Sequence, residues 1–216
     1  MQSNFIDNVS KVLQAELPGE AAQLKMANAF RKTRPSDPND VRIASVLLLL
    51  YQKDKNWYFP LIQRTSDNPN DRHGGQISFP GGKREESDQD LSETALREAE
   101  EEIGVQQKDI QLLGKLTPLY IPVSNFMVHP FVGYLPYPPQ FKRQELEVVK
   151  VLETSLSELQ NTDNHKQKDI ALRQGIRLKE VPYFELQQHT VWGATAMMLS
   201  EWLAVIENMK TKHVNH

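Results

Sequence analysis

The sequence contains no cysteine, and this absence removes several kinds of chemistry at once. Disulfide bonds, thiolate zinc sites and cysteine nucleophiles are all excluded. A chain without cysteine is compatible with a reducing compartment. Residues 1–7 also lack the basic and then apolar order of a secretory signal peptide. We therefore expect a soluble protein of the cytoplasm.

The sequence also lacks an excess of charge of one sign and a long hydrophobic run. It has 25 basic and 28 acidic residues, which gives a formal net charge of -3. Nucleic acids and anionic membranes usually bind a basic surface, so neither is an expected partner. The longest apolar run, residues 44–51, is broken only by Ser45. It is far shorter than the roughly 20 residues that span a bilayer.

The chain of 216 residues is long enough for one domain with a real hydrophobic core. Residues 4–30 have the apolar spacing of amphipathic helices, broken at Pro18, and residues 34–40 read as a linker. We therefore expect an N-terminal helical extension, 1–40, and a main domain, 41–210. The apolar face of the extension could pack on the core or on a partner subunit, which makes a homodimer a hypothesis.

The main domain reads as a series of strands with few helices. Strands are expected at 42–52, 57–64, 76–79, 110–121, 126–135, 146–153 and 181–186, and a polar loop at 161–168. Helices are expected at 90–103 and 192–209, with a helical turn at 155–159. Because only one of the two helices interrupts the strands, the pattern predicts an α/β (α+β) sandwich with a mixed sheet.

Acidic residues crowd the predicted helix at 90–103. Glu98, Glu101 and Glu102 have the spacing that places them on one helix face, where their charges repel. Clustered carboxylates suit Mg²⁺ or Mn²⁺, which would relieve this repulsion. The simpler alternative is a solvated acidic face. Gly81 and Gly82 favour the metal site, because glycine permits close backbone approach and the Gly82 carbonyl could join the ligands.

Residues 82–105 resemble the Nudix box. Its second half is a glycine-terminated Arg-Glu…Glu-Glu pattern, and residues 97–105, REAEEEIGV, match it in full. In the first half, Gln89 stands where a glutamate is usual, and one extra residue after Gly82 places Asp88 at that position. The resemblance implies a Nudix α/β/α sandwich and the hydrolysis of a nucleoside diphosphate linked to another group.

The longer box also resembles one branch of the family, the coenzyme A pyrophosphatases. In that branch the box follows Phe-Pro-Gly-Gly, which is present at 79–82, after an upstream motif that residues 61–66, LIQRTS, and 72–75, RHGG, resemble. The branch cuts the pyrophosphate of coenzyme A to give 3′,5′-ADP and 4′-phosphopantetheine. Arg64 and Arg72 are then candidates to bind substrate, because a guanidinium matches the geometry of phosphate.

The resemblance assigns roles to residues of the box and one residue beyond it. Glu98 and Glu102 are the expected metal ligands, with Glu101 and the Gly82 carbonyl as further candidates. The catalytic candidates are Glu101 and Glu147, either of which could be the general base, and Arg97 of the box. Two alternatives remain: a Nudix hydrolase of another substrate such as ADP-ribose, and a catalytically silent domain. A catalytically silent domain is disfavoured because the Arg-Glu…Glu-Glu core is intact.

Overall fold

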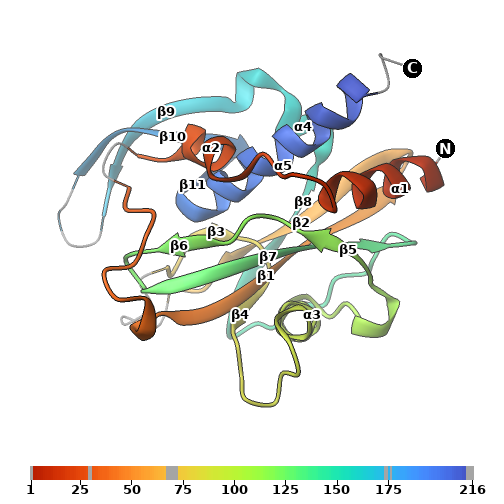
Figure 1. The fold of residues 1–216 in the computed structure, drawn as a ribbon, viewed down its shortest axis with the longest axis horizontal. Coiled ribbons are helices and arrows are strands. Elements are labelled where there is room, and N and C mark those ends of the chain that lie inside the picture. Colours follow the sequence, from red (N-terminus) through yellow and green to blue (C-terminus); the bar gives the residue numbers. More distant parts are fainter. Residues whose placement is uncertain (1, 29–30, 67–72, 173–174, 176, 213–216) are drawn as a thin grey trace.

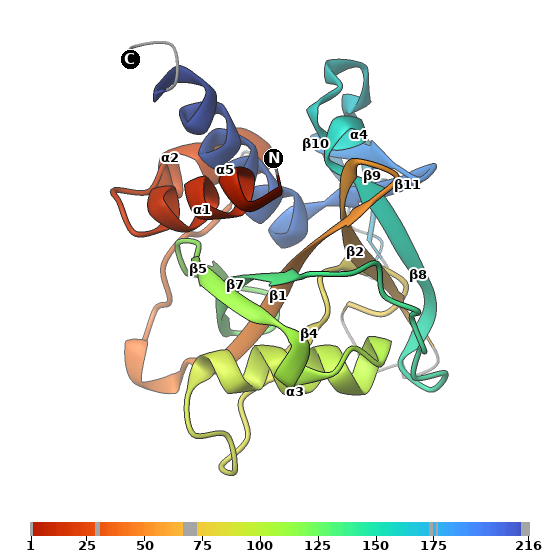
Figure 2. The ribbon, with the colours of Figure 1, turned by 90° about the vertical axis from the view of Figure 1, so that its right-hand side faces the viewer.

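The computed structural model describes residues 2–28, 31–66, 73–172, 175 and 177–212. A mixed sheet separates two helical layers, as the sequence predicts (Figures 1 and 2). Helix α3 (Leu91–Ile103) covers one face, and helices α1 (Gln2–Leu13), α2 (Gly19–Gln23) and α5 (Gly193–Lys212) lie on the other. The α/β/α sandwich is therefore confirmed. None of the described helices combines the length and the apolar character needed to cross a membrane.

Strand β1 (Arg42–Lys53) lies at the centre of the sheet. It pairs antiparallel with β2 (Asn56–Arg64) through a tight hairpin and parallel with β7 (Phe126–Leu135). The strand order is β3-β2-β1-β7-β5, with β3 at Ile77–Ser78 and β5 at Gln111–Lys115. Three strands lie off this path: β4 (Gly81–Lys83) on β1, β6 (Leu119–Ile121) on β7, and β8 (Val148–Ser155) on β2.

The alternation of side chains along β1 divides the core in two. Leu47 and Leu49 pack with Ala95 and other apolar residues of α3. Leu48 and Leu50 point the other way and join the larger cluster, which includes the residues of α1 and α5. Successive residues of a strand face opposite sides of a sheet, so a strand covered on both faces is apolar throughout. This explains the long apolar run in the sequence.

Two expectations about the strands were wrong in detail. Residues 110–121 form two strands, β5 and β6, which both pair antiparallel with β7, and the strand is interrupted between them, where Pro118 has no N–H for a sheet ladder. The loop expected at 161–168 is a short helix, η4 (Thr162–Asn164), followed by strand β9 (His165–Ala171). Because β9 is almost entirely exposed, its sequence carries no apolar alternation, and pairing with β10 defines it.

Strand β9 belongs to a second, smaller sheet near the C-terminus. Its order is β11-β10-β9, with β10 at Arg177–Leu186 and β11 at His189–Trp192. Helix α4 (Leu156–Gln160) precedes this smaller sheet in the chain. In the main sheet, a single helical turn, η3 (Gln107–Asp109), precedes β5. The smaller sheet ends at β11. This sheet leads directly into α5, so it holds the start of that helix beside the main sheet (Figure 1).

The N-terminal helices pack on the chain's own core. Ile6, Val9 and Val12 of α1 are buried in the cluster that contains α5, and Phe5 stacks on Trp57 at 4.5 Å between ring centroids. Helix α2 continues into η1 (Leu24–Met26), and η2 (Pro38–Asp40) precedes β1. The apolar face of α1 is thus already covered. A homodimer stays a prediction, without support from that face.

One buried carboxylate ties this N-terminal region to the rest of the fold. Glu201 of α5 is fully buried. It accepts hydrogen bonds from the Gly19 backbone, from Gln23 Nε2 at 2.8 Å and from Thr117 Oγ1 at 2.6 Å. Because an unpaired buried carboxylate would be costly, these donors from two other segments hold α2 and the β5–β6 connection against α5.

Candidate active site

Helix α3 begins and ends at well-defined residues. The Asp90 carboxylate accepts hydrogen bonds from the backbone N–H groups of Ser92 at 2.7 Å and Glu93 at 3.0 Å. Glu93 reaches back to the Gln89 N–H at 2.6 Å, one residue before the partner that a capping box predicts. At the other end Gly104 has a φ of 74° and caps the helix as expected. The helix therefore presents its carboxylates in a fixed position.

Arg97 organises the side chains along this helix. Its Nε and Nη2 donate to the two carboxylate oxygens of Asp88 at 2.9 and 3.1 Å. Its Nη2 also donates to the Lys83 carbonyl at 3.3 Å, which joins β4 to α3. Asp88 is only 3% exposed, and its hydrogen bonds with Arg97 hold the pKa of its carboxyl below the usual range. Asp88 thus takes the place of the usual glutamate.

Glu98 and Glu102 lie between α3 and β4. Glu102 is 1% exposed and accepts a hydrogen bond from the Gly81 N–H at 2.8 Å, and Arg64 Nη1 is 3.4 Å from its other oxygen. Burial raises the pKa of Glu102 to about 8, and the negative charges of Glu98 and Glu147 add to this rise. Burial likewise raises the pKa of Glu98, against the opposing effect of Arg97.

The glycines of β4 allow this close approach. A Cβ atom at Gly82 would lie 2.5 Å from Glu98 Oε1, which no side chain could tolerate without a shift. Gly81 has a φ of +151°, and a Cβ there would lie 2.4 Å from the Ser45 carbonyl oxygen. Gly81 therefore requires glycine, because strand β4 lies close against β1, whereas a side chain at Gly82 would displace the carboxylate of Glu98.

The donor set fits a hard divalent cation. Glu98 and Glu102 offer carboxylate oxygens beside the backbone of Gly82, and oxygen donors are those that Mg²⁺ and Mn²⁺ prefer. Among the described residues, no three acidic or histidine side chains converge closely enough to form a ready-made metal site. Glu101, the third candidate, has a side chain that is 57% exposed and pairs with Arg97 Nη1 at 3.1 Å.

Glu147 approaches this cluster from another part of the chain. It lies in the turn before β8 rather than within the expected strand, and its carbonyl accepts a hydrogen bond from the Thr65 N–H at 2.9 Å. Its side chain is exposed, and its charge raises the pKa of both Glu98 and Glu102. The structure therefore brings Glu147 to the carboxylates, within reach of water.

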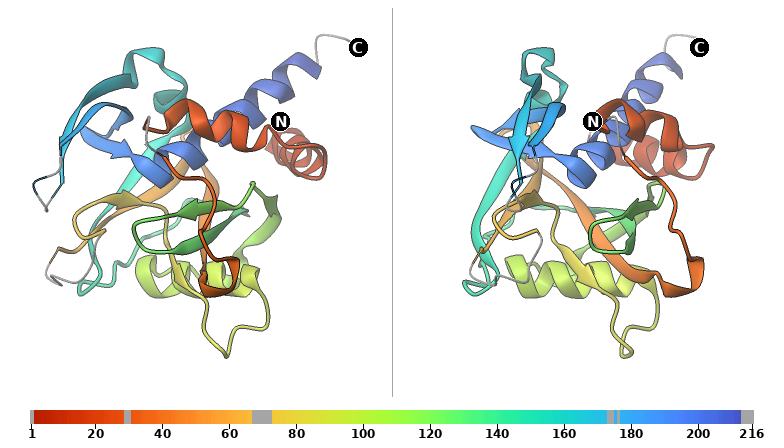
Figure 3. Two further views of the ribbon diagram at one scale, coloured as in Figure 1. Left: turned by 60° about the vertical axis from the view of Figure 1, so that its left-hand side comes forward. Right: turned by 90° about the vertical axis from the view of Figure 1, so that its left-hand side faces the viewer.

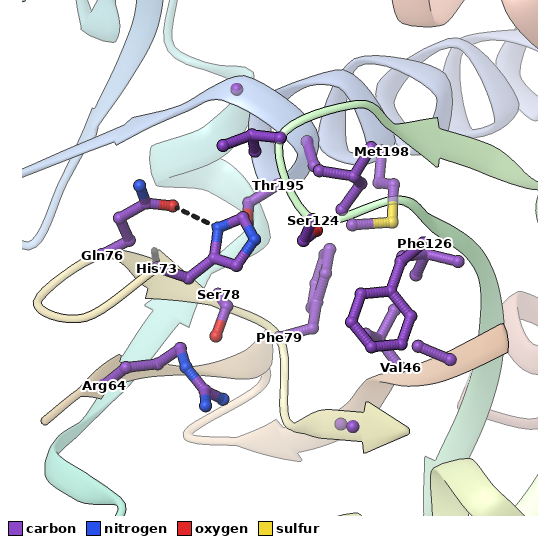
Figure 4. A pocket seen from close by; sticks show the side chains of 18 of the residues that line it. Val46, Arg64, His73, Gln76, Ser78, Phe79, Ser124, Phe126, Thr195 and Met198 are labelled. Atoms are coloured by element: carbon purple, nitrogen blue, oxygen red, sulfur yellow. Dashed lines mark hydrogen bonds between the residues drawn. The ribbon is translucent and has the colours of Figure 1, made fainter. Parts of the chain in front are cut away.

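A cavity of about 380 Å³ opens beside β4 (Figure 4). Gly82 and Arg64 lie on its wall, so the cavity adjoins the carboxylates. Apolar side chains form much of the remainder: Phe79, Ile121, Phe126, Trp192 and Met198. Figure 4 shows His73 and Gln76 at one side, joined by a hydrogen bond of 3.2 Å.

The sequence placed some of these cavity residues and missed others. Arg64 is on the wall as expected for a substrate-binding residue. Arg72, its predicted companion, lies outside the described residues. Arg31 also lines the cavity, although it belongs to the N-terminal extension. No local pattern distinguishes Arg31 from other arginines of a polar linker, so only the folded chain could identify it.

Comparisons with known proteins agree with this geometry. The model of the NUDIX domain family matches residues 41–174. An uncharacterized Nudix hydrolase of Photorhabdus laumondii, NudL, is 36% identical over 179 residues, which are 81% of this chain and 92% of the relative. NudL of Pectobacterium atrosepticum, also uncharacterized, is 36% identical over 130 residues, which are 60% of this chain and 66% of the relative.

A solved structure supports the fold. The binary complex of a Caenorhabditis elegans Ap4A hydrolase aligns with a TM-score of 0.51 at 14% identity, and the alignment covers 78% of this chain and 99% of that one. At this level of identity the likeness concerns the arrangement of helices and strands alone. It agrees with a mixed sheet between helical layers.

Proposed function

This chain belongs to the Nudix hydrolase family, and from that premise we propose that it is a coenzyme A pyrophosphatase. As a member of the family, it is a hydrolase of nucleoside diphosphate derivatives. The observation that carries the narrower proposal is the Asp88–Arg97 ion pair. It shows that the chain accommodates the extra residue after Phe-Pro-Gly-Gly while keeping the box intact, and this longer box is the feature typical of the coenzyme A branch.

The cavity also supports this substrate. Coenzyme A carries a long pantetheine arm on one side of its pyrophosphate, in which methyl and methylene groups alternate with two amides and a hydroxyl. The cavity begins at Gly82 beside the carboxylates and continues along Phe79, Trp192 and Met198. An arm held against these side chains would leave the pyrophosphate next to Glu98 and Glu102. Apolar surfaces that are buried together favour binding of such an arm.

The roles of the residues follow from their positions. A bound Mg²⁺ or Mn²⁺ supplies charge neutralisation at the phosphoryl oxygens, and Glu98 and Glu102 are the residues that would hold it. Water attacks one phosphorus, the bridging P–O bond breaks, and two phosphate monoesters leave. Glu147 is the better placed general base, because it is exposed beside the carboxylates, whereas Glu101 is paired with Arg97. Arg97 positions Glu98, its partner at 3.0 Å.

Arg64 takes a role at the bond that is cut. Its guanidinium lies 3.4 Å from Glu102, where the oxygens of a pyrophosphate would approach. A guanidinium there can bind phosphate oxygens with charge-assisted hydrogen bonds. We therefore assign Arg64 to the pyrophosphate rather than to the 3′-phosphate of coenzyme A. Arg72 stays a predicted substrate-binding residue on the evidence of its motif alone.

The experiment that tests the proposal is a comparison of substrates with identification of the products. The purified protein is incubated with Mg²⁺ or Mn²⁺ and, in parallel, with coenzyme A, ADP-ribose and a nucleoside triphosphate. We expect 3′,5′-ADP and 4′-phosphopantetheine to form fastest, as measured by mass spectrometry. Faster hydrolysis of ADP-ribose or the triphosphate would reject coenzyme A as the substrate while leaving the family activity in place.

A further inference from the structure

An arginine from outside the matched family domain forms part of the cavity wall. Arg31 precedes residue 41, where the match to the Nudix family begins, yet it lines the cavity together with Ile121 and Ser124. Residues 31–37 run past β6 toward η2 and the start of β1 (Figures 1 and 3). The N-terminal extension therefore reaches the site as well as packing on the core.

The guanidinium of Arg31 is held by a backbone carbonyl, and among the described residues it has no counter-charge. Its Nη2 donates to the Tyr120 carbonyl of β6 at 2.5 Å. Its Nε is buried and has no hydrogen-bond partner. In the part of the chain that the structure describes, no carboxylate forms an ion pair with Arg31. Burial lowers the pKa of this guanidinium from its ordinary value, which reflects the cost of removing a cation from water.

The other arginines near the cavity, Arg64 and Arg42, have a charged or an aromatic partner. Arg64, at the end of β2, lies beside Glu102. Arg42, next to the β6–β7 turn, donates to the Ser124 carbonyl and lies 4.2 Å from the ring centroid of Phe126. In the sheet order, β2 and β7 flank β1 on opposite sides, and β6 pairs with β7. Of the arginines on the cavity wall, Arg64 therefore lies at the carboxylates and Arg31 lies on the β6 side, and Lys83 of β4 also lines the cavity.

We propose that Arg31 is an anion-binding subsite for a second negatively charged group of the substrate, separate from the pyrophosphate that is cut. The inference rests on the proposed use of this cavity as the substrate pocket. The Arg31 guanidinium, on the cavity wall, could form charge-assisted hydrogen bonds to such a group, and the anion would supply a counter-charge. The N-terminal extension then takes part in substrate recognition.

Two parts of a substrate of the coenzyme A type have the required chemistry. One is the 3′-phosphate on the ribose, and the other is the carboxylate at the end of a dicarboxylic acyl chain. Both are anions that a guanidinium binds through the same fork of donors. They can be separated with pairs of substrates that differ by one anionic group: coenzyme A against dephospho-coenzyme A, and malonyl-coenzyme A against acetyl-coenzyme A.

The test compares Arg31→Gln with a matched control, Arg34→Gln. Glutamine keeps a donor for the Tyr120 carbonyl but removes the charge, and Arg34 is an exposed arginine of the same segment. In Arg31→Gln we expect kcat/KM to fall about 10- to 100-fold for the anionic member of one pair, mainly through KM. For the member of that pair that lacks the extra anionic group, kcat/KM should change little. Arg34→Gln should leave the ratio of kcat/KM values within each pair unchanged. The pair that responds identifies the anion.

If Arg31→Gln leaves the ratio of kcat/KM values within each pair unchanged, the subsite is rejected, whether the variant keeps its activity or loses it equally for both substrates. A thermal melt of each variant separates loss of fold from loss of recognition. If the wild-type protein hydrolyses no coenzyme A derivative, the proposed function fails, and the subsite is then judged by calorimetric binding without turnover. The ligands would be 3′,5′-ADP against AMP, and malonyl- against acetyl-coenzyme A. A preference for the anion that Arg31→Gln abolishes keeps the subsite, and a preference that persists rejects it.

Discussion

Arg97 donates two hydrogen bonds to Asp88, at 2.9 and 3.1 Å, and a third to Glu98 at 3.0 Å. One guanidinium thus connects the loop before α3 with a carboxylate that we assign to the metal. Asp88 is also held by Thr94 Oγ1 at 2.8 Å and by the Glu85 N–H at 2.9 Å. The position of Glu98 therefore depends on a loop residue that does not line the cavity.

This dependence predicts the effect of Asp88→Asn. The substitution leaves the buried side of Arg97 without its counter-charge, so we expect a loss of roughly 3 kcal/mol in the free energy of unfolding. Because Glu98 is no longer held in one orientation, kcat should fall about 10- to 100-fold. Urea unfolding and steady-state kinetics measure the two effects. Glu86→Gln, in the exposed part of the same loop, is the control, and equal effects in both variants would contradict the assignment.

The Asp88–Arg97 ion pair also predicts that the free energy of unfolding depends on pH. The folded-state pKa of Asp88 is depressed, chiefly by its hydrogen bonds with Arg97. Its contribution is therefore complete above the unfolded pKa of about 3.9 and is lost as pH falls toward the folded value. Unfolding at a series of pH values from about 6 downward should show wild type and Asp88→Asn converging below pH 4. A constant difference across that range would show that the charge of Asp88 is not responsible.

The sequence predicted the part of the site that lies on one continuous segment. Helical spacing placed Glu98 and Glu102 on one face, and the glycine and aspartate signals placed the helix ends, because these depend on local geometry. Glu101 shows the limit of predictions that rest on helical spacing alone. It shares the face in sequence terms, yet Arg97 draws it outward to an exposed position. A helical wheel cannot show which neighbour competes for a carboxylate.

Residues that reach the site from a distance were harder to predict. Glu147 was placed near the site by resemblance alone, and its approach depends on the contact of its turn with the end of β2. Arg31 carries no local signal, since its position results from the path of the N-terminal segment along β6. Strand β9 was missed for a related reason, because backbone pairing rather than apolar alternation defines it. Long-range placement therefore required the structure.

Gly82→Ala should damage the site without unfolding the domain. The new Cβ would lie 2.5 Å from Glu98 Oε1, so the carboxylate must move away from β4. We expect kcat to fall at least about 10-fold, with a stability loss on the order of 1 to 3 kcal/mol. A double-mutant cycle with Glu98→Gln provides the control. If both residues act through one contact, the second substitution adds little to the first, and additive losses would place the effect elsewhere.

Glu102→Gln should raise the stability of the metal-free protein at alkaline pH while abolishing its activity. Burial raises the folded-state pKa of Glu102 to about 8, so the wild type loses stability as pH rises through that value and the carboxylate ionises. Glutamine has no charge to bury, so at pH 8.5 the variant should be more stable by at least about 1 kcal/mol.

The metal response of the same variant gives an independent measurement. Wild type should gain melting temperature on addition of Mg²⁺ or Mn²⁺, because a ligand that binds the folded state stabilises it. Glu102→Gln should gain much less, and its kcat should fall by several orders of magnitude, as should that of Glu98→Gln. A variant with near-normal turnover would remove that residue from the metal ligands. Glu100→Gln, on the same helix, is the control and should respond as wild type.

Glu147→Gln and Glu101→Gln distinguish the two candidates for the general base. The base must be reachable by water and free to accept a proton. Glu147 is exposed beside Glu98 and Glu102, whereas Glu101 is paired with Arg97 at 3.1 Å. We therefore expect Glu147→Gln to lower kcat about 100-fold or more, as measured by steady-state kinetics. Glu101→Gln should lower kcat less, because its loss affects only the orientation of Arg97. The reverse pattern would assign the base to Glu101 and leave Glu147 as a residue that tunes the charge of the cluster.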